Sequence, residues 1–286
     1  MQRLMSERSS ARCGWVCAAL TVSLIGCAVR SPPAPVAQRV LVSFWDHGEQ
    51  DGALYGVDLD GVNSTWRSER CDDYPDETRS DGVMGIDNRY ASLVSLARDD
   101  STLGGVASGV TSAVAAQLAS AEGLVGFDVV RAEADGETPI VMVTLLVLEA
   151  AAPLSAGADE HLLGTESFTA RPLERVSAEP IGFRWRARFA SLAVPLGPVL
   201  GTHLVRDVVL DFELGSDGRL VRADVGGAVA LDTAAEVTAR LLDDDEEAAR
   251  DVLWALGVFD LEPNADGTEC AAMSIGLAID LVPIAR

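Results

Sequence analysis

The chain has 286 residues, and its 44 acidic residues outnumber its 22 basic residues, all of them arginine, so the formal charge at neutral pH is −22. This balance, without any run of basic residues, excludes a nucleic-acid-binding protein, because such proteins neutralise phosphates with Lys and Arg. With 48% hydrophobic residues the chain can bury a substantial core and is not a disordered tail.

The first 26 residues have the charge order of a bacterial export signal. Arg3, Arg8 and Arg12 precede an apolar stretch from Trp15 to Gly26. As a helix this stretch would be about 18 Å long, against about 30 Å for the hydrocarbon core of a bilayer, so it is too short for a permanent anchor. We therefore expect residues 1–26 to be removed as a signal peptide.

The apolar stretch ends in Leu24-Ile25-Gly26-Cys27, which resembles the lipobox of bacterial lipoproteins. Gly26 leaves room for a peptidase, and the sulfur of Cys27 is the nucleophile that takes a diacylglyceryl group as a thioether. Because one acyl chain holds only marginally, two or three chains make a stable anchor. We predict that acylated Cys27 binds the lipid bilayer, and Ala28 favours the outer membrane by resemblance to the lipoprotein sorting rule. An ordinary secretory signal with a chance cysteine is the alternative.

A short tether follows the predicted anchor. Residues 31–37 read Ser-Pro-Pro-Ala-Pro-Val-Ala, a composition that stays extended at about 3.1 Å per residue. We assign residues 27–38 to the tether and residues 39–286 to one globular domain, because no repeat and no second proline-rich linker occurs. From Cys27 onward the chain has 19 basic and 43 acidic residues, a formal charge of −24.

Two cysteines remain once Cys27 is acylated. Cys71 and Cys270 would reside in an oxidising compartment, so we predict a disulfide between them that ties an early loop to the last strand. The chain-entropy model gives about 4 to 5 kcal/mol for a loop of that length. Two free or buried thiols are the alternative.

An acidic loop near Cys71 is the candidate metal site. Oxygen ligands at this density suit Ca²⁺, which takes about 6 to 8 of them in flexible geometry. No motif requires a cofactor, so Ca²⁺ is the one candidate ion, and a solvated acidic loop is the alternative. The candidate ligands are Asp72, Asp73, Asp76, Asp81, Asp87 and Asn88.

Alternating and continuous apolar runs predict a mainly antiparallel β protein. The expected strands cover residues 39–45, 140–148, 183–189, 203–214, 219–225 and 272–284, with a hairpin turn at Ser216-Asp217-Gly218. The run 140–148 is almost wholly apolar, which indicates a strand that is covered on both faces.

The strand at 183–189 carries a row of arginines on one face. Phe183, Trp185, Ala187 and Phe189 alternate with Arg184, Arg186 and Arg188. Three guanidinium groups can bind an anionic sugar, a phosphate or an acidic protein edge. Alternatively, acidic residues of neighbouring strands neutralise them in cross-strand salt bridges.

Two helical regions are expected among these strands. The first covers 103–119, and the second begins at Thr233 with Glu236 at capping-box spacing, then restarts near Asp245 and ends at Gly257. The predicted fold is α+β and β-rich: an antiparallel sandwich or jelly-roll-like domain with two packed helical regions.

The sequence has no recognisable catalytic constellation. A Gly-x-Ser-x-Gly nucleophile elbow is absent, the lack of lysine excludes a phosphate-binding glycine loop of the usual kind, and His47, His161 and His203 are scattered. The leading hypothesis is a non-catalytic binding or structural lipoprotein of the cell envelope, with an envelope glycan or protein as partner. The alternatives are a carboxylate-dependent polysaccharide hydrolase and a calcium-stabilised adhesion or lectin-like module.

Several sequence motifs together resemble the outer-membrane lipoproteins of myxobacterial type. They are the lipobox, Asp-Gly…Ile-Asp-Asn at 81–88, Asp-Gly-x-Leu-Val…Gly-Gly-Ala-Val at 217–229, and Cys270…Met-Ser-Ile-Gly-Leu at 273–277. The resemblance implies a lipid-anchored envelope protein and brings no established activity with it.

Overall fold

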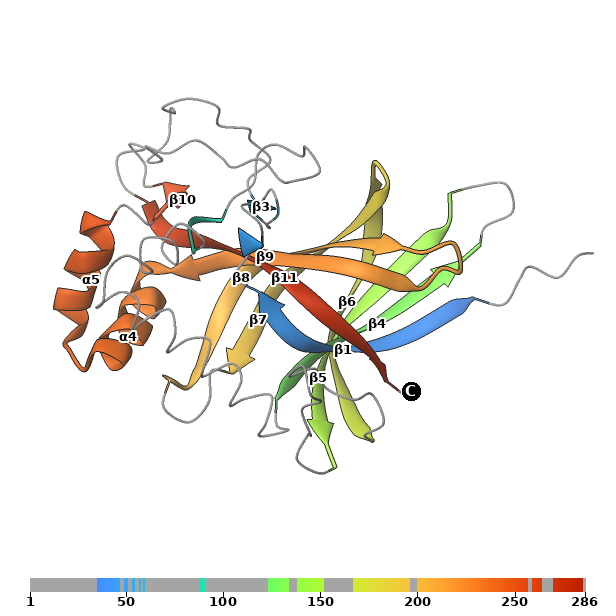
Figure 1. The fold of residues 1–286 in the computed structure, drawn as a ribbon, viewed down its shortest axis with the longest axis horizontal. Coiled ribbons are helices and arrows are strands. Elements are labelled where there is room, and N and C mark those ends of the chain that lie inside the picture. The colour runs from blue at the N-terminus through green and yellow to red at the C-terminus, as the bar shows by residue number, and fades with distance from the viewer. Residues whose placement is uncertain are drawn as a thin grey trace, which may run out of the picture. The chain divides into compact units, whose positions relative to one another are not determined.

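Eight antiparallel strands pair side by side until the last meets the first, which closes the sheet into a barrel (Figure 1). The computed structural model describes residues 35–46, 49–50, 53–54, 57, 59, 88–90, 123–133, 138–151, 167–195, 200–256, 259–263 and 270–284. The barrel strands, in their order around the sheet, are β1 (Val36–Asp46), β4 (Leu124–Ala132), β5 (Ile140–Ala150), β6 (Phe168–Ile181), β7 (Arg184–Pro195), β8 (Thr202–Leu214), β9 (Leu220–Ala230) and β11 (Cys270–Ile284).

The pairing of β1 with β11 closes the barrel. It runs from Arg39 opposite Ile284 to Asp46 opposite Ala278, with one irregularity between Val42 and Phe44. The short strand β10 (Leu261–Pro263) adds to β11 beyond the point where β1 ends, and β2 (Glu49–Gln50) with β3 (Ala53–Leu54) forms a separate two-stranded sheet. The predicted sandwich or jelly roll is therefore wrong.

An apolar core fills the space that the strands enclose. Every one of the eight strands contributes to this cluster, which includes Phe127, Leu145, Phe189, Leu210 and Phe212. The rings of Phe127 and Phe189 lie 6.3 Å apart across it. Eight-stranded barrels are filled by side chains or hold one small ligand, and here the inward side chains of the described residues form one buried apolar cluster.

The strand β5 has both faces buried, as its apolar run predicts. Leu145 belongs to the central core, whereas Leu146 and Leu148 pack on the outer face with Leu41 of β1 and Ile284 of β11. The prediction of a strand covered on both sides is confirmed, and the second cover reinforces the β1–β11 closure.

The expected strands are all present, but the prediction of which β8 residues face the core is partly wrong. In β8, Val208, Leu210 and Phe212 point into the core as the alternation predicts, whereas Leu204 is exposed and Val205 takes the inward position instead. The alternation changes phase at Asp207, which has a positive φ of 50° where the register with β9 shifts. A β-bulge inserts one residue and thereby exchanges the two faces of a strand.

Two short helices occur in the described part of the chain, α4 (Leu231–Leu242) and α5 (Glu246–Ala255). The predicted start of α5 is confirmed, because the Asp245 side chain accepts a hydrogen bond from Ala248 N. The predicted capping box at Thr233 is wrong, because α4 begins at Leu231 as a continuation of β9, and Glu236 pairs with Arg240 one turn further on. The predicted helix at 103–119 lies outside the described residues.

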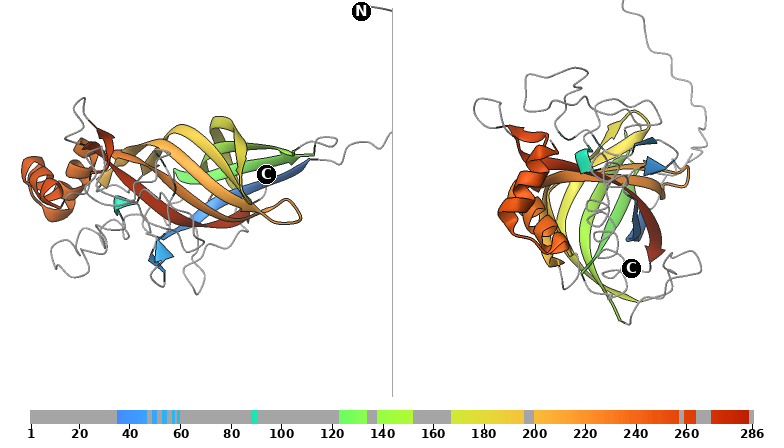
Figure 2. Two further views of the ribbon diagram at one scale, coloured as in Figure 1. Left: turned by 90° about the horizontal axis from the view of Figure 1, so that it is seen from above. Right: turned by 60° about the vertical axis from the view of Figure 1, so that its left-hand side comes forward.

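The barrel has two chemically different ends (Figures 1 and 2). We call one the entry end, because β1 begins there at Val36, beside the turn 215–219 between β8 and β9. The turn 181–184 between β6 and β7 lies at the same end of the sheet, on strands further around the barrel. The other, the helix end, carries α4 and α5. Gly218 has a φ of 77° and forms the β8–β9 turn as predicted, with Gly215 N donating to Arg219 O at 2.7 Å.

A glycine on the outer face of β9 allows the side chain of Val57 to lie against the barrel wall. The Cβ of any larger residue at Gly226 would lie 2.2 Å from Val57 Cγ2 and 3.1 Å from Ile275 O. Val57 is fully buried, and Leu59 joins Leu261 and Ala272 in a small apolar cluster beside it. Because Gly226 has no side chain, Val57 has room to pack directly against the barrel wall.

We expect G226A to lower the free energy of unfolding by about 1–3 kcal/mol, because an added methyl group overpacks the contact with Val57. Urea denaturation followed by circular dichroism measures this. A double-mutant cycle with V57A is the control: the two losses should be less than additive, because V57A removes the clashing atom. Strict additivity would show that the two residues do not touch in solution.

Candidate functional site

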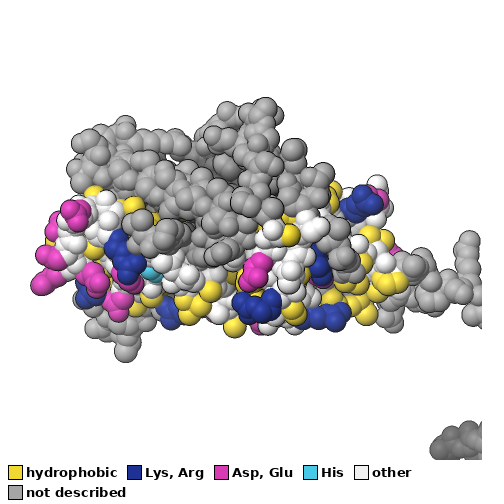
Figure 3. Space-filling model, turned by 90° about the horizontal axis from the view of Figure 1, so that it is seen from below, with side chains coloured by type: hydrophobic (Ala, Val, Ile, Leu, Met, Phe, Trp, Pro, Cys, Tyr) yellow, Lys and Arg dark blue, Asp and Glu magenta, His cyan; other side chains and the backbone are white. Residues whose placement is uncertain are grey.

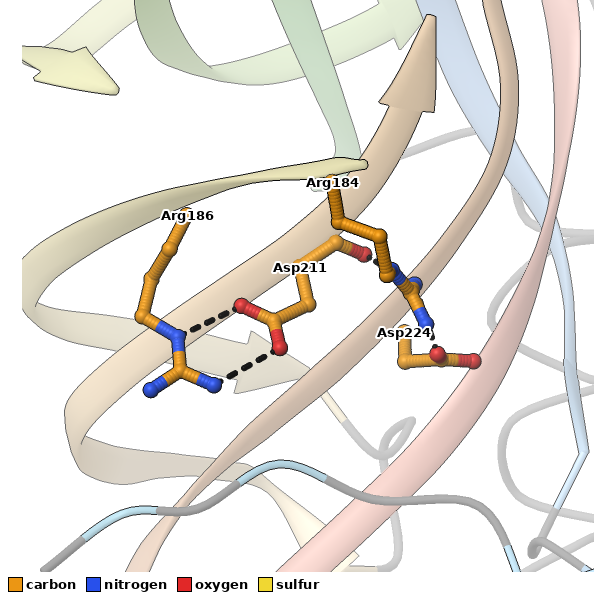
Figure 4. Close-up of polar contacts among 4 residues, drawn as sticks. All are labelled: Arg184, Arg186, Asp211 and Asp224. Carbon is orange, nitrogen blue, oxygen red and sulfur yellow. Dashed lines mark hydrogen bonds and ion pairs between the residues drawn. The ribbon is translucent and has the colours of Figure 1, made fainter. Parts of the chain in front are cut away.

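The most deeply buried ion pairs in the described part of the chain lie on the outer face of β7, β8 and β9. They consist of Arg184 and Arg186 of β7, Asp211 of β8 and Asp224 of β9 (Figure 4). The neighbours of these residues along each strand, such as Phe212 and Ala223, point into the core. Strand alternation therefore directs the four charged side chains outward.

The two aspartates face each other across the sheet, because Asp211 and Asp224 occupy directly opposite positions of β8 and β9. Like charges in this arrangement repel each other. Arg186 binds Asp211 through two parallel hydrogen bonds, Nε to Oδ1 at 2.7 Å and a terminal nitrogen to Oδ2 at 2.8 Å. Arg184 reaches over β8 and donates to Asp224 Oδ2 at 2.8 Å and to the carbonyl oxygen of Asp211 at 2.9 Å.

This group of four is formally neutral and nearly closed to solvent. The side chains of Arg184 and Asp224 are 5% and 0% exposed, and those of Arg186 and Asp211 are 11% and 7% exposed. Removing one partner of such a buried pair would leave a charge without its counterion, which is strongly destabilising. The chemistry of this group suits the joining of three strands rather than the capture of a soluble anion.

The structure thus separates the three predicted binding arginines. Arg184 and Arg186 lie in the cross-strand ion pairs, which was the alternative interpretation of the arginine row, whereas Arg188 is exposed further along β7 opposite Val209. Asp211 and Asp224 were not singled out from the sequence. Their signal was alternation, since each lies between two inward-facing apolar residues of its strand.

A second outward ion pair follows the same rule at the β1–β4 junction. Arg39 and Asp128 are opposite each other in the register and form two hydrogen bonds of 2.8 and 3.0 Å. The hydrogen bond to the carboxylate raises the pKa of Arg39 above its ordinary value. Ion pairs on the outer face therefore join β1 to β4 as well as β7 to β8 and β9.

A gap in the pairing of β11 is filled by side chains. On the edge of β11 that faces away from β9, no described strand pairs with residues 273–277 between β1 and β10. There the amide of Asn88 accepts from Gly276 N at 3.0 Å and donates to Gly276 O at 2.9 Å. Asp260 accepts from Ser274 N at 2.7 Å and from its hydroxyl group. The Ser274 oxygen in turn accepts from Arg89 N at 2.8 Å.

These contacts attach the helical turn at Arg89 and Tyr90 to the edge of the barrel. Asn88 and Ser274 are 3% and 0% exposed, and Tyr90 packs near Phe259 and Met273 of the apolar cluster at the helix end. Burial raises the pKa of the Tyr90 phenol. Asn88, one of the predicted calcium ligands, here replaces a missing strand partner.

The other predicted site residues are mostly outside the described residues: Cys27, Cys71, Asp72, Asp73, Asp76, Asp81 and Asp87. Cys270 is buried at the start of β11 opposite Pro263. The disulfide between Cys71 and Cys270 and the Ca²⁺ site therefore stay predictions. Within the described ranges, no group of three or more His, Cys, Asp or Glu side chains is arranged to hold a metal ion.

Of the three histidines, His203 is described, and its contacts are structural. His203, at the start of β8, contacts Leu200 O through Nε2 at 2.5 Å and lies 4.0 Å from Glu236 of α4 through Nδ1. Arg240 of α4 donates to the same carbonyl oxygen at 2.8 Å. Together these contacts fasten α4 to the turn that precedes β8.

Comparison with known proteins gives no relative: no family model, no curated protein and no solved structure matches this chain. The resemblance to lipoproteins of myxobacterial type therefore remains a hypothesis from motifs. Of the helices described, none is long and apolar enough to cross a membrane.

We expect D224N to lower the free energy of unfolding by about 3–5 kcal/mol, because it removes the counterion of a buried guanidinium group. The double variant R184M/D224L should lose much less, since it removes both charges together. Urea denaturation measures both. D232N is the control, because the Asp232–Arg250 pair is exposed and should contribute about 1 kcal/mol or less. Equal losses in D224N and D232N would contradict the buried pairing.

We also expect N88A to lower the free energy of unfolding by about 1–3 kcal/mol, because the buried N–H and C=O groups of Gly276 lose their partners. S177A, at an exposed position of β6, is the control. The loss should be the same with Ca²⁺ and with a chelator. A Ca²⁺-dependent rise in the melting temperature that disappears in N88A would instead make Asn88 a metal ligand.

Proposed function

We propose that this chain is an exported lipoprotein, held on the bacterial outer membrane by acylated Cys27, whose barrel has a non-catalytic binding or structural role. The single observation that carries the proposal is the lipobox Leu24-Ile25-Gly26-Cys27 at the end of a short apolar export signal. No other segment of the sequence has a comparably specific chemical meaning.

The arrangement of the barrel supports the non-catalytic part of the proposal. Its centre is filled with apolar side chains from all eight strands. Among the described residues, the most deeply buried carboxylates are those of Asp211 and Asp224, and arginines bind both. Carboxylates that act as general acid and base need separated pKa values and room for a substrate between them. The ion pairs of Asp211 and Asp224 instead join neighbouring strands of the barrel.

The position of β1 supports a lipid-anchored domain on a short tether. The first strand begins at Val36, which leaves residues 27–35 between the acylated cysteine and the barrel. Fully extended, such a segment reaches about 30 Å at most. The barrel therefore works close to the membrane surface, where an envelope glycan or a protein of the same membrane is within reach.

We expect C27A to abolish acylation and membrane attachment. When the full chain is produced in a Gram-negative host, mass spectrometry of the N-terminal peptide should show a diacylglyceryl group and an acyl chain on Cys27, and the protein should float with membrane vesicles. The C27A protein should lack both. C17A is the matched control, because Cys17 lies in the segment that is expected to be removed. An unmodified, soluble parent protein would refute the anchor.

A further inference from the structure

The exposed apolar side chains of the barrel are concentrated at the entry end. Of the nine large hydrophobic residues that are exposed in the described part of the chain, five lie there: Val36, Ile140, Ile181, Phe183 and Val221. Phe183 is 68% exposed, Val221 is 67% exposed and Ile140 is 54% exposed. Soluble surfaces tolerate scattered apolar residues, whereas a collection at one end indicates a contact surface.

Strand register brings these five residues to the same end. Val36 lies opposite Arg131, and Ile140 lies opposite the next residue of β4. The turn after β6 presents Ile181 and Phe183 on either side of Gly182, where no other atom comes within 4 Å of an added Cβ. In Figures 1 and 2 both hairpin turns and the start of β1 lie on the side away from α4 and α5.

Val221 is exposed because of a bulge in the turn region of β9. The register of β8 with β9 shifts between Glu213 and Leu214, so Val221 has no partner position opposite it. Leu220 points into the core and Val221 points out. The bulge therefore places an apolar side chain on the surface at the end where the chain enters the barrel.

Acidic residues are concentrated at the helix end, opposite to the exposed apolar residues. Residues 231–256, which form α4 and α5, contain eight acidic residues and two arginines. Figure 3 shows this acidic group at the helix end, with apolar side chains more prominent toward the other end. Anionic lipid head groups repel an acidic surface, so a membrane would orient the helix end away from itself.

We propose that the entry end docks on the lipid bilayer that holds Cys27, with Phe183, Ile181 and Val221 inserted among the head groups. This inference rests on the proposed lipid anchor, because residues 27–35 keep this end within about 30 Å of the acyl chains. Apolar side chains of interfacial proteins lie about 5–10 Å into the boundary between head groups and acyl chains. The anchor and the turns together fix the orientation of the barrel.

The test compares two tryptophan substitutions in the full-length, acylated protein. F183W places a tryptophan at the entry end, and L204W places one at the start of β8, an exposed apolar position at the other end of that strand. Both proteins are inserted into vesicles of phosphatidylcholine and phosphatidylethanolamine with or without bromine on the acyl chains. The parent protein supplies the emission of the native tryptophans for subtraction.

We expect the emission of F183W to shift to the blue on vesicles and to be quenched by brominated lipid at least about twice as strongly as that of L204W, as interfacial burial requires. Equal quenching, with intact acylation and flotation, would overturn the docking and leave the anchor standing. An unacylated parent would refute the anchor and the docking together. Loss of a dimer in F183S, measured by sedimentation in detergent, would make the entry end a contact between two copies and would also overturn the proposal.

Discussion

The hydrogen-bonded pairing of β1 with β11 is the contact on which the remaining structure depends. Without it the sheet would have two long open edges, and unpaired strand edges invite association with other chains. The pairing joins residues from opposite ends of the described sequence, such as Arg39 and Ile284. Leu41, Leu146 and Leu148 cover part of its outer face and the central core lies on its inner face, while Asp280 and Pro283 of the seam are exposed.

Closure also explains how the chain uses its few arginines. A barrel wall needs its outer face to be polar or covered, and in this acidic chain one pair of outward positions on neighbouring strands brings two carboxylates together. Asp211 and Asp224 are this pair, and Arg184 and Arg186 neutralise them within the sheet. Arg39 does the same for Asp128. Residues 231–256, which form α4 and α5 at the end opposite to the start of β1, keep eight acidic residues against two arginines.

Local features were predictable from the sequence because their causes are local. Alternation identified β7, the continuous apolar run identified β5 with two buried faces, and Asp217-Gly218 identified the β8–β9 turn. The inward face of β8 was predicted only in part, because the bulge at Asp207 exchanges the faces and leaves no clear mark in the residue pattern. The capping box failed because α4 begins at Leu231, directly after β9, so Thr233 lies within the first turn of the helix instead of at its N-cap.

Long-range features were not predictable in the same way. Whether antiparallel strands form a sandwich or a barrel depends on which distant edges meet, and no residue of β1 or β11 encodes that choice alone. The same applies to the candidate site. The arginine row was visible in the sequence, but its partners on β8 and β9 depend on register, and the amide contacts of Asn88 depend on a gap in the pairing of a strand far along the chain.

The gap in β11 has a consequence for how the barrel folds. One side of this strand pairs with β9, while the other is shared among β1, β10 and the side chains of Asn88 and Asp260. These partners are separated from β11 by very different lengths of chain, from the neighbouring β10 to the far more distant β1. Because contacts between distant residues form slowly, the hairpins from β4 to β9 can assemble early. The final seam joins β1, the Asn88 turn and β11, which are far apart in the chain, so we expect barrel closure to be a late step of folding.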